Sequence, residues 1–188
     1  MFALGIDPGL SRCGYGLVER RGAKMRAVSA GVITTPAGDP LHERLATLRS
    51  DLRQLVDELK PDVVVVERVF FQTNARTAMS VGQASGVALL TAAEAGCDVV
   101  EYTSNEVKMA VTGDGAAGKA QVQEMVARLL SLSSTPRPPD AADALALAIC
   151  HLTTVPLRVA AAAAMARPVW HPAQGPPAGT PRREKIVT

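Results

Sequence analysis

The chain has 188 residues and a formal net charge of +2, a length that suits one ordinary domain with a tail and allows a sizeable core. Residues 1–157 contain 15 Lys and Arg against 17 Asp and Glu, whereas residues 158–188 contain five against one. The body therefore lacks the strongly basic character typical of nucleic-acid-binding domains, and any phosphate-binding surface must be local.

The cysteines and the amino terminus indicate the compartment. Cys13, Cys97 and Cys150 are far apart and lack the short paired spacings of a zinc site, so they fit thiols in a reducing cytoplasm. The opening MFALGID lacks the charged and long apolar regions of a signal peptide. The Ala-rich run at 159–166 is too short to cross a membrane. These features predict a soluble cytoplasmic protein with no membrane partner.

The first third of the chain reads as three strands and a helix. Segments 2–7, 13–20 and 26–34 are β-prone and separated by turns, which predicts an antiparallel meander. Leucines then recur every three or four residues over 41–59, which predicts an amphipathic helix. Asp39 and Pro40 are the expected cap and first position of that helix, and Pro61 prevents its continuation.

The remaining elements alternate. DVVVVE at 62–67 predicts a central strand covered on both faces, and a helix over 74–95 and a strand over 98–102 follow. Thr103 and Glu106 have capping-box spacing before a short helix near 107–111. Helices are expected over 119–132 and 140–152. Residues 1–155 are thus predicted to form one domain. The Ala/Pro-rich basic residues 156–188 are predicted to form a disordered tail.

Four acids stand where chemistry is expected. Asp7 and Glu67 each end a predicted buried strand, and parallel strands would bring them to one sheet edge. Asp140 and Asp143 share one face of the last helix. Four such carboxylates repel one another unless a divalent cation binds them. Oxygen-only ligands favour Mg²⁺ or Mn²⁺, and two ions about 3.5 to 4 Å apart are a known device for displacement at phosphorus.

Each acid also has a purely structural interpretation. Asp7 before Pro-Gly resembles a turn former, and Asp140 after two prolines resembles a helix N-cap. Asp143 would lie in the first helical turn, where the helix dipole favours acids. Glu67 has no obvious structural duty at the end of a valine strand.

Taken in order, the motifs resemble the RuvC family of Holliday junction endonucleases over roughly residues 3–152. The motifs are LGIDPG and GYG near the start, V-E-x-V-F at 66–70, GQASGVAL at 82–89, VK at 107–108, GKAQVQ-x-MV at 118–126 and DAADALALAI at 140–149. The resemblance implies an α/β ribonuclease H-like fold, with a five-stranded mixed sheet whose first three strands are antiparallel, flanked by helices. It implies that Asp7, Glu67, Asp140 and Asp143 are ligands of two Mg²⁺ ions.

The resemblance also implies an activity and partners. RuvC-like proteins are homodimers that bind four-way DNA junctions and make paired symmetric nicks, leaving 5′-phosphate and 3′-hydroxyl ends. RuvA and RuvB, the branch-migration proteins, are the partners it implies. The small residues of GQASGVALLTAA allow either tight packing within the domain or a place near the dimer interface.

Several residues are candidate DNA contacts. Phe70 matches the base-stacking aromatic of the family, while Phe71 fits the core at least as well. Lys108 and Lys119 match basic positions of the family, and the local positive charge would offset the acids and hold phosphate. Lys119 also begins a helix after a Gly-rich turn and is expected to take part in catalysis. Arg12, Arg68 and Arg76 are further candidates for backbone contacts.

Three competing functions can be separated from this one. YqgF-type RNA-processing nucleases also open with a G-x-D-x-G strand, but V-E-x-V-F favours a junction substrate. An actin-like or sugar-kinase ATPase would need two halves of this kind, and the chain supplies one. A junction-binding scaffold without chemistry is disfavoured because all four acids are present.

Overall fold

A computed structural model of the chain describes residues 1–68 and 75–163, with 75–77 and 156–163 as backbone only. Five strands form one sheet in the order β3-β2-β1-β4-β5. They are β1 (Phe2–Asp7), β2 (Arg12–Arg21), β3 (Lys24–Thr34), β4 (Val63–Glu67) and β5 (Asp98–Tyr102). The first three strands pair antiparallel, as the sequence predicts, and β4 pairs parallel with both β1 and β5. The valines of β4 are buried because neighbouring strands and helices cover them.

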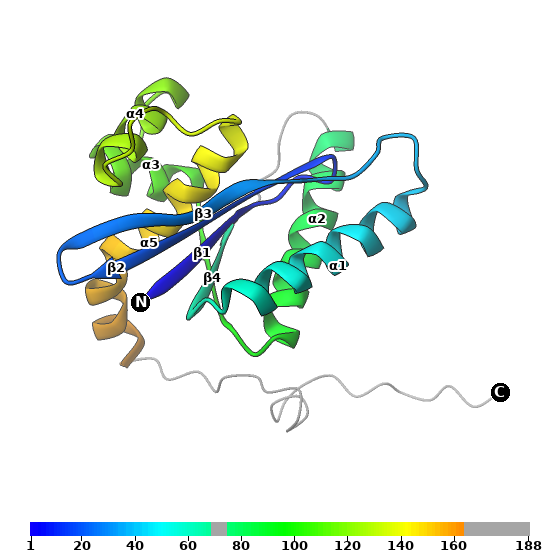
Figure 1. The fold of residues 1–188 in the computed structure, drawn as a ribbon, viewed down its shortest axis with the longest axis horizontal. Coiled ribbons are helices and arrows are strands. Elements are labelled where there is room, and N and C mark those ends of the chain that lie inside the picture. Colours follow the sequence, from blue (N-terminus) through cyan, green and yellow to red (C-terminus); the bar gives the residue numbers. More distant parts are fainter. Residues whose placement is uncertain (69–74, 164–188) are drawn as a thin grey trace.

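Helices cover both faces of this sheet (Figure 1). One layer holds α1 (Leu41–Leu59) and α2 (Ala75–Glu94), and the other holds α3 (Ser104–Thr112), α4 (Lys119–Leu129) and α5 (Pro139–Ala163). The predicted bounds of α1 and β5 match those observed, and α2 and α4 differ from prediction by a few residues at their ends. No helix in the described part of the chain is long and apolar enough to cross a membrane.

Helix α5 is longer than the sequence predicted. It was expected to end at residue 152 but continues to Ala163, so residues 156–163, which were assigned to a disordered tail, form its last turns. Pro156 has no N–H and cannot bond the carbonyl of Leu152 in the preceding turn. Arg20 from β2 donates a hydrogen bond to that carbonyl instead. The helix thus passes a proline because another element satisfies the freed acceptor.

The starts of α1 and α3 contrast. Asp39 was expected to cap α1, but the N-cap is Pro40, whose side chain makes no capping bond. The backbone N–H groups of Glu43 and Arg44 bond the carbonyl of Pro40, so the helix begins one residue too late for Asp39 to cap it. At α3 the predicted capping box forms: the Thr103 hydroxyl accepts from the Glu106 N–H, and the Glu106 carboxylate accepts from the Thr103 N–H at 2.8 Å.

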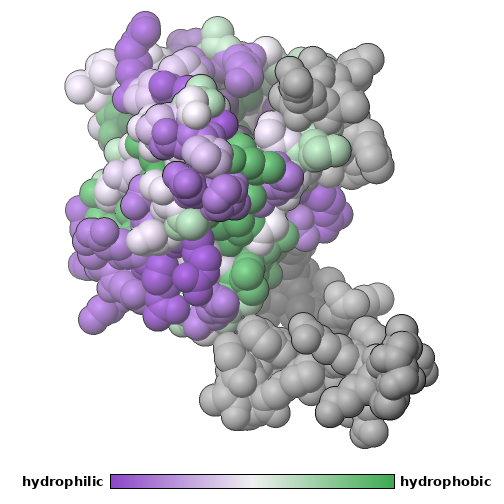
Figure 2. Space-filling model, turned by 90° about the vertical axis from the view of Figure 1, so that its right-hand side faces the viewer, coloured by the Kyte–Doolittle hydropathy of each residue, from purple (hydrophilic) through white to green (hydrophobic). Residues whose placement is uncertain are grey.

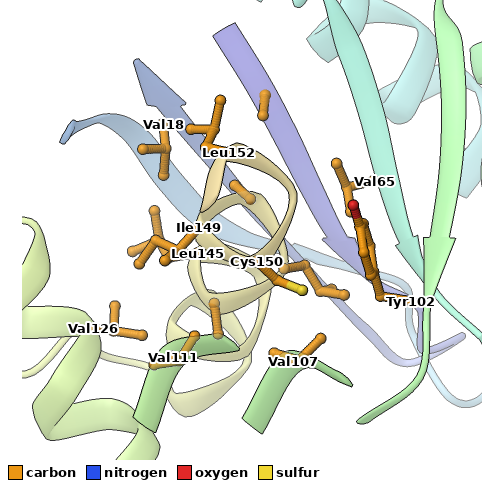
Figure 3. Close-up of a cluster of buried hydrophobic side chains, with 14 of the residues drawn as sticks. Val18, Val65, Tyr102, Val107, Val111, Val126, Leu145, Ile149, Cys150 and Leu152 are labelled. Carbon is orange, nitrogen blue, oxygen red and sulfur yellow. The ribbon is translucent and has the colours of Figure 1, made fainter. Parts of the chain in front are cut away.

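Two apolar cores lie on opposite faces of the sheet. Figure 3 shows the first, in which Leu145, Ile149 and Leu152 of α5 lie between the strands and the α3–α4 pair. The second lies under α1 and α2 and includes Leu48, Leu52 and Val56. Residues alternate between the two cores along β4. Each fully buried aliphatic side chain stabilises the fold by roughly 1.5 to 3 kcal/mol relative to an exposed one.

Candidate active site

Three of the four predicted acids line one cleft of about 340 Å³. Asp7 ends β1, Glu67 ends β4, and Asp143 lies in the first part of α5. Because β1 and β4 are parallel, with Ile6 opposite Val66, the two strand-ending acids emerge at the same edge of the sheet. The convergence of Asp7 and Glu67 therefore follows from strand pairing.

Glycines bring α5 onto this edge. A Cβ atom on Gly5 would collide with the backbone carbonyl of Ala144, and one on Gly14 would collide with that of Asp140. The backbones of β1 and β2 therefore touch the backbone of α5 at Gly5 and Gly14. A residue with a Cβ atom at either position would push the strand and the helix apart. Gly14 also lies opposite Asp7 in the β1–β2 register. The GYG motif thereby fixes the acidic end of α5 beside Asp7.

The buried carboxyl groups of the cleft resist ionisation. The pKa of Asp7 is raised to about 7, first by burial and then by the negative charges of Glu67, Asp143 and Asp140. The pKa of Glu67 is also raised, by burial and by Asp143, while a hydrogen bond to Asp7 acts in the opposite direction. Raised carboxyl pKa values of this kind indicate that too little positive charge lies near the carboxylates. A bound cation would supply that charge and lower the pKa values.

Two lysines line the same cleft. The Nζ atom of Lys119, the first residue of α4, lies 3.1 Å from Oδ2 of Asp143. This hydrogen bond, together with the charge of Asp143, raises the pKa of Lys119, so the ammonium stays protonated. The Lys119 side chain is 78% exposed, which leaves N–H donors accessible to a ligand. Lys108 lines the cleft from α3.

Asp140 does not join the cleft lining. Its Oδ2 accepts hydrogen bonds from Arg12, at 3.1 Å from Nε and 2.8 Å from Nη2. Burial acts to raise the pKa of Asp140, but the Arg12 guanidinium outweighs it and holds that pKa below its usual value. The prediction that four carboxylates converge is therefore correct for three of them. The fourth, Asp140, pairs with Arg12, and its charge still raises the pKa of Asp7.

The donor set of the cleft suits a hard divalent ion. Within residues 1–68 and 75–163, no group of three or more His, Cys, Asp or Glu side chains is positioned to hold a metal. The acids of the cleft nevertheless offer only carboxylate oxygens, the ligands that Mg²⁺ and Mn²⁺ prefer. Burial raises the pKa of the nearby Cys13 thiol to about 12, and hard ions such as Mg²⁺ prefer oxygen to sulfur ligands.

Comparison with known proteins identifies the lineage. The family model described as crossover junction endodeoxyribonuclease RuvC matches residues 3–151. The chain belongs to the RuvC family. A crossover junction endodeoxyribonuclease RuvC of Chloroflexus aggregans is 54% identical over 156 residues, which cover 83% of this chain and 95% of the relative.

Solved RuvC structures confirm the fold. Thermus thermophilus RuvC is 37% identical, with a TM-score of 0.77 over 84% of this chain and 97% of that one. T. thermophilus RuvC in complex with Holliday junction substrate is 34% identical, with a TM-score of 0.76 over 84% and 96% of the two chains. The predicted α/β ribonuclease H-like fold and the predicted family are thus confirmed.

The other predicted DNA contacts of this RuvC-family chain are only partly described by the structure. Phe70 and Phe71 lie outside the described residues, and only the backbone of Arg76 is described. Arg68 is exposed beyond Glu67, and its N–H bonds the carbonyl of Tyr102 at 2.8 Å. Ser104, in contrast, lines the cleft and was not predicted. The sequence offered one signal for Ser104: it directly follows the capping residue Thr103, at the start of the helix that also carries Lys108.

Proposed function

We propose that this chain resolves four-way DNA junctions by paired, symmetric hydrolytic nicks in recombination and repair. One observation carries the proposal: in a RuvC-family fold, acids from β1, β4 and α5 share a cleft with Lys108 and Lys119. The relative solved with a Holliday junction substrate supports a junction as the DNA.

Asp7, Glu67, Asp140 and Asp143 would hold two Mg²⁺ ions in each site, with Mn²⁺ as a substitute. When bound, these ions activate water and stabilise the leaving oxygen. The raised pKa values of Asp7 and Glu67 support this assignment, because a dication would compensate the charge that burial makes unfavourable. The acids would thus hold the ions from two strand ends and a helix, where the backbone is fixed.

The lysines hold the phosphate against this acidic site. Lys119 would contact a non-bridging oxygen of the scissile phosphate, since its ammonium lies at the cleft and is exposed. Lys108 would contact the same strand from α3. In the reaction, a water oxygen bonds to phosphorus, the bond from phosphorus to O3′ breaks, and O3′ takes a proton. The products carry 5′-phosphate and 3′-hydroxyl ends, which a ligase can rejoin.

The junction contacts extend beyond the cleft. Phe70, three residues after Glu67 in the sequence, would stack on an unpaired base at the crossover. Arg68 and Arg76 would contact backbone phosphates nearby, and these contacts position the DNA without reading its sequence.

Paired nicks need two active sites, and we assign the outer face of α2 to the homodimer contact. Met79 is 67% exposed and Leu90 is 50% exposed on this face, with Gly82 and Gly86 between them at helical spacing. On the side of the molecule where α1 and α2 lie, apolar residues form a band between hydrophilic ones (Figure 2). Sedimentation velocity should give a dimer mass, and a monomer at micromolar concentration would contradict the assignment.

The branch-migration proteins RuvA and RuvB would deliver the junction to this dimer.

The test is a gel assay on a synthetic mobile four-way junction and a linear duplex of matched sequence, each with Mg²⁺, Mn²⁺ or EDTA. We expect symmetric nicks in opposing strands of the junction alone, with ligatable ends, and none in EDTA. Binding without cleavage under every metal condition would indicate a scaffold. Equal cleavage of junction and duplex would overturn junction specificity.

A further inference from the structure

Arg12 stands apart from the other cations of the site. Lys108 and Lys119 line the cleft, whereas Arg12 lies at the start of β2 and directs two N–H donors to the same oxygen of Asp140. Its side chain is 49% exposed and that of Asp140 is 27% exposed. The pair therefore lies at the rim of the site, where solvent or DNA can reach the guanidinium.

The backbone that carries Arg12 is held in place by a separate polar network. Thr35, which is buried, donates its N–H to the carbonyl of Ser11 at 3.3 Å. Arg44 of α1 donates to the hydroxyl of Ser11 at 2.7 Å and to that of Thr35 at 3.0 Å. Any exchange of partners by Arg12 must therefore come from its long, exposed side chain.

We propose that Arg12 couples DNA binding to metal binding: its guanidinium holds Asp140 beside the cleft in the free protein, and a DNA phosphate that takes the guanidinium releases this carboxylate to the divalent ion. The inference rests on the proposed function, since it takes DNA as the ligand and Asp140 as a metal ligand. Arg12 is thus a positioning residue that acts through Asp140.

The exchange follows from the chemistry of the three groups. A guanidinium pairs well with either a carboxylate or a phosphate, so the DNA backbone competes directly with Asp140 for Arg12. A divalent ion competes with Arg12 for Asp140, because both guanidinium donors occupy Oδ2 and two cations at one carboxylate repel each other. When the ion and the phosphate are present together, the phosphate takes Arg12 away from Asp140 and the ion takes Asp140 away from Arg12. Each ligand therefore makes binding of the other more favourable. Linkage then requires that the ion strengthens DNA binding by the same factor by which DNA strengthens ion binding.

The decisive experiment measures that factor. The affinity of full-length protein for a fluorescent junction is determined by anisotropy in EDTA and in Ca²⁺, with gels confirming that the DNA stays intact. For the wild type we expect Ca²⁺ to strengthen binding about 10-fold, within the usual range of coupling. In Arg12→Gln, DNA affinity falls in both conditions, but the strengthening by Ca²⁺ drops at least several-fold below that of the wild type. An unchanged ratio would overturn the proposal, since an arginine that only contacts DNA lowers both affinities alike.

Two controls separate this coupling from simple loss of charge. Arg53→Gln removes a 43%-exposed arginine that pairs with Asp57 on α1, and it should keep the wild-type ratio. Arg12→Lys keeps the charge without the planar fork and should retain part of the coupling. Wild-type ratios in both Arg12 variants would reject the coupling.

A second readout needs no DNA. Mn²⁺ binding, followed by electron paramagnetic resonance, should tighten several-fold in Arg12→Gln relative to wild type, because Asp140 has lost its competitor. Weaker Mn²⁺ binding in the folded variant would show that Arg12 orients Asp140 for the ion, and would overturn the proposal. Failure of the proposed function is distinguishable, because it would appear as no preference of the wild type for junction over duplex.

Discussion

The two helical layers of this protein meet the same sheet in different ways. On one side, α5 contacts β1 and β2 through Gly5 and Gly14, whose missing Cβ atoms let the backbones touch. On the other side, α1 packs through the buried side chains of Leu48 and Leu52. The glycines of α2 do not meet the sheet, because a Cβ at Gly82 or Gly86 would contact nothing within 4 Å.

The difference explains where the chemistry lies. The charged cleft residues that helices supply, Asp143, Lys108 and Lys119, come from the layer that contains the backbone contact. Backbone contact leaves little room for adjustment, and sites that position reacting groups need such fixed geometry. The α1–α2 layer instead keeps an open face, which suits a subunit contact.

The largest expected effect comes from removing the backbone contact. Gly14→Ala places a methyl against the carbonyl of Asp140 and should destabilise the fold by about 3 kcal/mol or more, with loss of cleavage. Gly38→Ala, in the loop before α1, meets nothing within 4 Å and should change stability by at most about 0.5 kcal/mol. Urea unfolding of both variants tests the contrast, and similar changes in both would contradict it.

Replacing the buried acid should separate activity from stability. Asp7→Asn removes a proposed metal ligand and should lower cleavage by about 1,000-fold or more, equivalent to roughly 4 kcal/mol. Junction affinity measured in EDTA should change little, because Phe70 and the lysines are intact. Single-turnover cleavage and anisotropy on the same preparation measure the two effects. Equal loss of both in a folded variant would refute the assignment.

The same variant should gain stability when metal is absent. The pKa of Asp7 is about 7 in the folded chain against an ordinary 3.8, so the folded state binds this proton more tightly than the unfolded state. Its contribution to stability therefore falls as pH rises from about 4 to about 7. In EDTA at pH 8, Asp7→Asn should be more stable than wild type by roughly 2 kcal/mol. A less stable variant under these conditions would show that the Asp7 carboxylate is well compensated.

A smaller effect is expected in the other layer. Arg49 of α1 and Glu94 of α2 form an exposed ion pair at 2.6 Å. Arg49→Ala should cost at most about 1 kcal/mol of unfolding free energy, since solvent screens such pairs. Cleavage should be unchanged. Chemical denaturation and the junction assay check both statements, and a large loss of cleavage would link this layer to the active site.

The smallest effect is expected at the carboxyl terminus. Deletion of residues 168–188 should leave metal-dependent junction cleavage substantially intact, because the cleft-lining residues in the described part of the chain all lie between Asp7 and Leu147. The measurement is the cleavage rate of the truncated and full chains on one junction. A truncated protein that folds and binds a junction but does not cut it would overturn this expectation.

Much of the fold could be predicted because its signals are local. The spacing of leucines gave the bounds of α1, and Thr103 with Glu106 gave the start of α3, since both patterns act within a few residues. The end of α5 could not be predicted in this way. Its continuation past Pro156 depends on Arg20, which is distant in sequence and satisfies the freed carbonyl of Leu152.

For the active site too, local features could be predicted from the sequence, whereas contacts between distant segments could not. The sequence by itself determined that Asp7 and Glu67 end apolar strands and that Asp140 and Asp143 share a helix face, because the period and apolar content of a segment are local properties. The tertiary structure decided which of them meet. Asp143 enters the cleft beside Lys119, while Asp140 pairs with Arg12, a residue far away in the chain. Ion pairing between distant segments depends on distance in space, and only the packing of α5 onto the glycines of β1 and β2 sets that distance.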